Sequence, residues 1–172
     1  MAKKHIIFLL LGSNIHPRTV YLNKAIEFID KSLGEIISVS SVYESEPWGF
    51  EASVAFLNLV VRVESAFEPL EILKRTQEIE RLLGRTTKTN GGYVSRTLDI
   101  DLLFFDDEII DMPELTVPHV QIVNRRFTLM PLVEVVPAKI HPVLKKTCRQ
   151  LLDGCTDGSK VWKFKEKQVY AL

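Results

Sequence analysis

The sequence predicts an α+β fold, a ferredoxin-like β-α-β-β-α-β sandwich with an antiparallel sheet and C-terminal additions. Two observations carry this prediction. Four segments have the apolar or alternating pattern of strands, and helical periodicity appears between the first and second of them and between the third and fourth. This order is that of the split β-α-β arrangement. Both helices are expected on one face of the sheet, so loops or a ligand should cover the other face.

The first half of the chain supplies two strands, a helix and a long loop. The strand His5–Leu11 is apolar on both faces. Pro17 opens a helix whose apolar residues recur at helical spacing, and Gly34 ends it. The second strand covers Glu35–Tyr43. The segment Glu44–Ala55 has no clear period, and a loop of this length inside a compact domain is often functional.

The third strand, Phe56–Val63, alternates between a purely apolar face and a mixed face. A second helix begins at Pro69, a residue favoured at the first helical position, and ends at Gly84. The irregular, cation-rich loop Arg85–Arg96 follows. The fourth strand then occupies the sequence RTLDIDLLFF, which ends at Phe105.

Beyond the fourth strand, the pair Asp106-Asp107 predicts a hairpin into Glu108–Ile110. A short helix is expected at Arg126–Val135. The residues after Pro142 resemble turn and loop. We therefore expect a single domain over residues 1–172, with a peripheral tail after about residue 142.

Composition limits the function classes. The 172 residues carry no net charge, 46% are hydrophobic and 26% are charged, which suits one globular domain. The neutral balance argues against bulk binding of nucleic acid or of a membrane surface. The apolar run Ile6–Leu11 is too short to span a bilayer or to serve as a signal peptide. Cys148 and Cys155 lack metal-binding spacing, so a reducing, cytoplasmic setting is expected.

Two aspartates in the fourth strand raise the question of function. Because side chains alternate along a strand, Asp99 and Asp101 point to one face, with Cα atoms about 6.5–7 Å apart. Two anions this close need a positive partner, which could be a divalent cation or Arg96. The alternative is an edge strand with a solvated, charged face.

The mixed face of the third strand favours the functional interpretation. If the apolar faces of both strands meet the helices, Phe56, Asn58, Asp99 and Asp101 share one floor, flanked by the two long loops. Carboxylates with arginines nearby suit phosphoryl transfer with Mg²⁺, although the chain has no P-loop motif. Several other residues could bind a ligand but could equally have only a structural role in a helix, a loop or the core. They are Glu80, Arg85, His119, Phe127 and Trp48.

Motifs along the chain then match a known family. LDIDLLFF is preceded by Arg96 and followed by LTVPH (Leu115–His119) and NRRF (Asn124–Phe127). With GSN after the first strand, FLN (Phe56–Asn58) and TQEIERLLGR (Thr76–Arg85), this pattern resembles 6-hydroxymethyl-7,8-dihydropterin pyrophosphokinase of folate biosynthesis. The resemblance covers roughly residues 5–142.

The resemblance implies transfer of pyrophosphate from ATP to the hydroxymethyl group of 6-hydroxymethyl-7,8-dihydropterin, leaving AMP and the pterin diphosphate. It implies that Asp99 and Asp101 hold two Mg²⁺ ions, and that Arg85 and Arg96 act with them in catalysis. The residues implied to bind the pterin are Ser45, Trp48, Phe56, Asn58 and Phe127. Those implied to bind ATP are Gln77, Glu80, Ile100, Leu102, Thr116, His119 and Arg125, together with the two catalytic arginines.

Some residues depart from the family pattern. Phe56 stands where a tyrosine is common, and Thr87, Tyr93 and Val120 also differ, which bears on lid closure and phosphate contact. A metal-dependent nucleotide hydrolase built on the same carboxylates is the main alternative. An RRM-like RNA-binding module is a lesser one, because Asp99 and Asp101 occupy positions where such a module needs aromatic residues. We expect a monomer that binds neither nucleic acid nor membranes.

Overall fold

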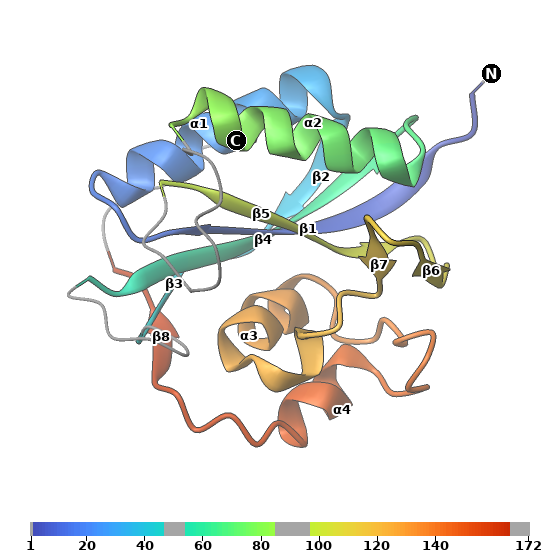
Figure 1. Ribbon diagram of the computed structural model, residues 1–172. Helices are drawn as coiled ribbons and strands as arrows, with labels where there is room; N and C mark the ends of the chain where they lie inside the picture. The colour runs from blue at the N-terminus through green and yellow to red at the C-terminus, as the bar shows by residue number, and fades with distance from the viewer. Residues whose placement is uncertain (1, 47–53, 85–96, 166–172) are drawn as a thin grey trace.

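The computed structural model describes residues 2–46, 54–84 and 97–165 (Figure 1). The main sheet has the strand order β5-β1-β4-β3-β8, and β2 also pairs with β4. All of its pairings are antiparallel. Its strands are β1 (His5–Ser13), β2 (Glu35–Val39), β3 (Tyr43–Ser45), β4 (Phe56–Ser65), β5 (Asp99–Phe105) and β8 (Val161–Lys163).

Helices cover both faces of this sheet (Figure 1). Helices α1 (Arg18–Ser32) and α2 (Pro69–Leu82) lie on one face, and α3 (Arg126–Val135) and α4 (Cys148–Asp153) lie on the other. The short 3₁₀ helix η1 (Ile122–Asn124) precedes α3. The predicted bounds of α3, the Pro69 start of α2 and its end before Gly84 are confirmed, and Gly84 has a positive φ.

The expectation that loops or a ligand alone cover the second face is wrong. A second core cluster lies there, built from Phe8, Leu10 and Val60 of the central strands together with Leu129 and Leu132 of α3. The cause was visible in the sequence, because β1 is apolar on both sides and each side must be buried. The tail contributes as well, since Cys148 and Leu151 belong to this second core.

The predicted apolar faces meet α1 and α2 as expected. Leu57, Leu59, Val61 and Val63 of β4 lie in the first core, with Leu98, Ile100 and Leu102. The pairing of β1 with β5 shifts between Phe8 and Leu9, which oppose Phe104 and Leu102. This bulge leaves Leu103 as an extra residue. Leu103 and Phe104 therefore both belong to the second core, and Phe105 belongs to the first.

Two further local expectations are corrected. The strand expected at Glu35–Tyr43 is divided into β2 and β3, because the hydroxyl of Ser40 accepts a hydrogen bond from the Val60 amide and interrupts the regular pairing. The segment after Asp106-Asp107 does not form a hairpin with β5. Instead β6 (Ile110–Asp111) pairs with β7 (Thr116–Val117) in a separate small sheet.

Candidate functional site

The predicted floor lies across the three adjacent strands β4, β1 and β5. The register pairs Gly12 of β1 with Asn58 on one side and with Asp99 on the other. Residues directly opposite one another in a sheet point to the same face. Two residues along β1, Leu10 stands between Val60 and Asp101 in the same way. The amide and the two carboxylates thus share the face that α3 covers farther along.

Gly12 is a site residue that the sequence indicated only as part of the motif GSN after the first strand. A Cβ atom added at Gly12 would lie 2.8 Å from Oδ1 of Asn58, closer than real Cβ contacts. The absence of a side chain therefore leaves room for the Asn58 amide in its observed position. A glycine inside a strand often marks such a close approach. The predicted strand ended at Leu11, whereas β1 extends to Ser13 and includes Gly12.

The Asn58 amide is buried and oriented by a neighbour. Asn58 is 3% exposed, and its Nδ2 donates a hydrogen bond to Oγ of Ser45 over 3.3 Å. Ser45 lies on β3 opposite Phe56, and Tyr43 of the same strand lies opposite Asn58. The structure thus brings three of the predicted pterin residues, Ser45, Phe56 and Asn58, into one corner of the sheet.

Glu80 holds the strand that carries the two aspartates. It is buried on α2, and its Oε1 accepts a hydrogen bond from the Ile100 amide over 2.8 Å. That amide belongs to the residue between Asp99 and Asp101. Since β5 is the outer strand of the sheet, this contact fixes an edge that would otherwise present an unpaired N–H group.

His119 reaches toward the carboxylates from the segment after β7. Its Nδ1 accepts a hydrogen bond from the Gln121 amide, and its Nε2 lies 4.0 Å from Oδ1 of Asp101. Burial lowers the pKa of His119, the nearby Arg125 lowers it further, and Asp99 opposes the shift. A neutral ring that accepts at Nδ1 carries its proton on Nε2. His119 therefore presents an N–H donor to the floor.

The first turn of α3 brings a cation and a ring to the same region of the chain. Arg125 is the residue that precedes α3, and its guanidinium carbon lies 5.7 Å from the centre of the Phe127 ring. Phe127 is half-buried and packs against the second core. Both residues were predicted as ligand-binding residues.

The remaining predicted residues have diverse positions. Gln77 is exposed on α2, one turn before Glu80, and Thr116 is exposed on β7. The side chains of Ile100 and Leu102 lie in the first core, so these residues offer a ligand chiefly main-chain atoms. Five predicted or noted positions lie outside the described residues: Trp48, Arg85, Thr87, Tyr93 and Arg96.

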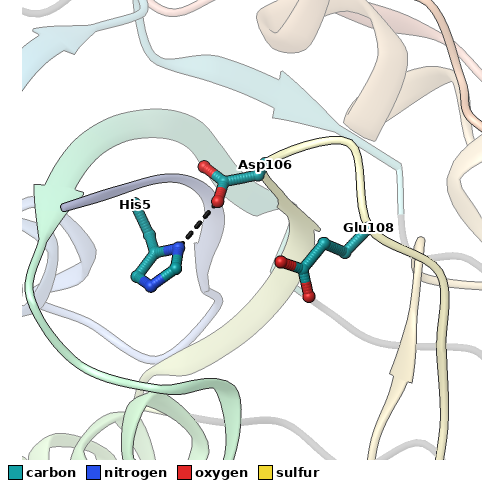
Figure 2. Close-up of side chains that lie close together, drawn as sticks. All are labelled: His5, Asp106 and Glu108. Carbon is teal, nitrogen blue, oxygen red and sulfur yellow. Dashed lines mark hydrogen bonds and ion pairs between the residues drawn. The ribbon is translucent and has the colours of Figure 1, made fainter. Parts of the chain in front are cut away.

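A second cluster of possible metal ligands lies at the far end of β1. His5, Asp106 and Glu108 form it, as Figure 2 shows. His5 and Gly12 are seven steps apart along β1, which corresponds to about 23 Å. Nδ1 of His5 lies 2.7 Å from Oδ2 of Asp106, and the other oxygen of Asp106 accepts from the Ile6 amide. These bonds join the start of β1 to the turn after β5 and give the cluster a structural role.

Comparison with known proteins identifies the chain's relatives. Residues 8–137 match the family model for 7,8-dihydro-6-hydroxymethylpterin-pyrophosphokinase. A 2-amino-4-hydroxy-6-hydroxymethyldihydropteridine pyrophosphokinase from Porphyromonas gingivalis is 45% identical over 80% of this chain and 94% of its own length. The protein of that name from Bacillus subtilis is 37% identical over 94% of this chain and 92% of its own length.

Solved structures support the fold. A Plasmodium falciparum HPPK-DHPS structure is similar with a TM-score of 0.72 and 21% identity, over 88% of this chain and 45% of the other. At this identity the similarity concerns the fold alone.

Within the part of the chain that the structure describes, no helix combines the length and apolarity needed to cross a membrane.

Proposed function

This chain belongs to the 7,8-dihydro-6-hydroxymethylpterin-pyrophosphokinase family, and from that premise we propose how its residues carry out the reaction. The enzyme transfers pyrophosphate from ATP to the hydroxymethyl group of 6-hydroxymethyl-7,8-dihydropterin, giving AMP and the pterin diphosphate in folate synthesis. The observation that supports our assignment of roles is the row Asn58–Gly12–Asp99 across three strands. With adjacent strands about 4.8 Å apart, this row separates amide and carboxylate by about 10 Å.

The phosphate end of the floor is assigned to Asp99 and Asp101. Both are partly exposed on one side of β5, and carboxylate oxygens are the donors that Mg²⁺ prefers. The donor set therefore fits magnesium, and we propose that these residues hold two Mg²⁺ ions together with ATP. The chemistry that bound Mg²⁺ supplies is neutralisation of the charge on the phosphates.

The pterin end is assigned to the corner around Asn58. Its amide offers a donor and an acceptor to the edge of a flat heterocycle, and Ser45, which accepts from Asn58 Nδ2, fixes the orientation of that amide. Phe56 and Phe127 are proposed to stack on the two faces of the ring. Trp48, outside the described residues, remains a proposed pterin contact.

ATP is proposed to lie between α2, β5 and the segment that carries His119. The Nε2–H group of His119 is oriented to donate to a phosphate oxygen, and Arg125 supplies a planar cation beside it. Gln77 and Glu80 of α2 and main-chain atoms of the outer strand β5 complete the proposed contacts, with Thr116. Arg85 and Arg96 retain their proposed catalytic role. Alignment and charge neutralisation would supply most of the rate acceleration.

An end-product assay tests these roles. With the dihydropterin and Mg-ATP, the wild-type chain should release AMP and the pterin diphosphate in equal amounts, whereas ADP with phosphate would indicate the hydrolase instead. Asp99→Ala and Asp101→Ala should each lower turnover by at least about 100-fold. Asp107→Ala is the matched control, because Asp107 lies beyond the other end of β5 and is exposed. Near-normal turnover of either floor variant at saturating Mg²⁺ would reject the metal role.

Four further properties of the whole chain are also proposed. The strand order β5-β1-β4 with β2 and β3 on β4 supports a ferredoxin-like arrangement with additions. Residues after Pro142 add a helix to the second core and a strand to the main sheet, which supports a single domain. Cys148 and Cys155 are free thiols, which supports the cytoplasm as the compartment. The monomeric state is retained as a proposal that sedimentation can test.

A further inference from the structure

The start of α3 is capped by a residue far along the chain. Arg125, the residue at the cap position, makes no side-chain capping hydrogen bond. Instead Oδ2 of Asp157 accepts a hydrogen bond from the Arg126 amide over 2.8 Å, across 31 positions of sequence. The first amides of a helix lack partners within the helix, and a carboxylate is the favoured acceptor at this end.

Asp157 is itself held in place by the local chain. Its other oxygen accepts from the amide of Ser159 over 3.0 Å and from the Ser159 hydroxyl. Burial raises the pKa of Asp157, but the hydrogen bonds from Ser159 and from the Arg126 amide outweigh it, so the pKa lies below its ordinary value. Asp157 is therefore an oriented carboxylate rather than a freely rotating surface group.

The same segment continues into the strand that borders the pterin corner. In β8, Val161 pairs with Ser45 and Trp162 pairs with Glu44 of β3 (Figure 1). Nε1 of Trp162 also donates to Glu44 over 3.2 Å. Residues 157–163 thus join two elements that carry proposed pterin contacts: α3, which bears Phe127, and β3, which bears Ser45.

The far end of α3 has an attachment of its own. Glu134 accepts hydrogen bonds from the amide and hydroxyl of Ser41 and from the hydroxyl of Tyr43. Loss of the Asp157 contact would therefore release the first turn of α3 while Glu134 and the apolar face of the helix still hold it against the sheet.

We propose that Asp157 is a positioning residue of the pterin subsite, which sets the place of the Phe127 ring relative to Ser45 and Asn58. The inference rests on the proposed role of those three residues in pterin binding. Asp157 itself is not assigned a contact with substrate. Its effect should therefore appear in the affinity for the pterin and not in the affinity for ATP.

The test compares both ends of one hydrogen bond. Asp157→Ala removes the acceptor. Arg126→Pro removes the donor N–H, at the first helical position, where proline is tolerated. Arg126→Ala controls for the lost arginine side chain, and Asp153→Ala controls for a lost exposed charge in the same part of the chain. For each variant, the dissociation constants of the pterin and of ATP are measured by titration, with the thermal midpoint alongside.

We expect Asp157→Ala and Arg126→Pro each to weaken pterin binding at least about fivefold, a magnitude typical of losing part of a charge-assisted hydrogen bond. ATP binding should stay within about twofold. The double variant should be no worse than either single one, because both remove the same bond. If Asp157→Ala does not fold, Arg126→Pro against Arg126→Ala decides the question alone.

Three outcomes would overturn the inference. One is unchanged pterin affinity in both variants. A second is an equal loss for pterin and ATP that follows the thermal midpoint, which would assign a purely structural role. The third concerns Phe127→Ala and Asn58→Ala, measured in parallel. If neither weakens pterin binding, the proposed subsite and this inference fail together, whereas loss in these two alone rejects only the role of Asp157.

Discussion

Replacing Gly12 with alanine should disturb the proposed pterin end of the floor without touching the carboxylates. The added Cβ would lie 2.8 Å from Oδ1 of Asn58, where ordinary contact begins at about 3.4 Å. The amide must therefore move by several tenths of an ångström. It has little room, because Asn58 is 3% exposed and its Nδ2 is directed at Ser45.

Two opposing contributions set the size of the effect. Alanine is favoured over glycine in a strand by roughly 0.5–1 kcal/mol, and crowding in a packed site costs about 1–3 kcal/mol. The net loss of unfolding free energy should be about 1 kcal/mol. A displaced amide that loses one hydrogen bond to the pterin should weaken its binding by about tenfold, or about 1.4 kcal/mol.

The assay is a pair of titrations, one with the pterin and one with ATP, together with urea unfolding. Gly154→Ala is the matched control, because a Cβ at that exposed glycine meets only the Gln150 carbonyl oxygen at 3.5 Å, an ordinary contact. If Gly12→Ala keeps wild-type affinity for the pterin while it folds normally, the close approach of Gly12 to Asn58 has no functional meaning. The row assignment would then lose its pterin end.

Three other changes have defined outcomes. Asn58→Ala should weaken pterin binding at least about tenfold and ATP binding little, so equal losses in paired titrations would count against the pterin assignment. Burial raises the pKa of the Cys148 thiol to about 11, so iodoacetamide should modify the partly exposed Cys155 first and Cys148 only after unfolding, as peptide mass mapping would reveal. Burial acts to raise the pKa of Glu134, but hydrogen bonds from Tyr43 and Ser41 outweigh it and lower the pKa. Glu134→Gln should therefore cost about 1 kcal/mol of unfolding free energy at pH 7, a small value because Glu134 is solvent-exposed. This difference in unfolding free energy from wild type should shrink below about pH 4.5, as the wild-type carboxylate is protonated. A difference in unfolding free energy that does not depend on pH would refute its electrostatic origin.

Local periodicity was sufficient to predict the floor. The alternation of Leu57, Leu59, Val61 and Val63 places Asn58 on the opposite face, and the same logic places Asp99 and Asp101. These inferences succeed because, in a strand with one buried face, only one of the two alternating sets of side chains can face the core. The helix signals Pro69 and Gly84 succeed for a similar reason, since each residue restricts the backbone directly.

Contacts between distant segments could not be read in this way. Asp157 gives no signal in the sequence that it caps the Arg126 amide, because the cap lies 31 positions away. The pairing of β6 with β7 was missed because the turn at Asp106, which has a φ of 47°, directs the chain away from β5 rather than back along it. Gly12 was predicted to follow the first strand, and its importance depends on the register with Asn58, which only the assembled sheet supplies.

The extra residue, Leu103, divides β5 into two halves, and the alternation of side chains between the two faces is set separately in each half. Before Leu103, the even-numbered Leu98, Ile100 and Leu102 face the first core, which turns the aspartates to the other face. After Leu103, the odd-numbered Phe105 faces the first core and Phe104 faces the second. Deleting Leu103 would therefore restore regular alternation, with Leu102 and Phe105 still in the first core and Phe104 still in the second. Homologous chains that shorten this strand by one residue should lose it at position 103, because removal there reorients neither the aspartates nor the phenylalanines, whereas removal before it would turn Asp99 and Asp101 to the other face.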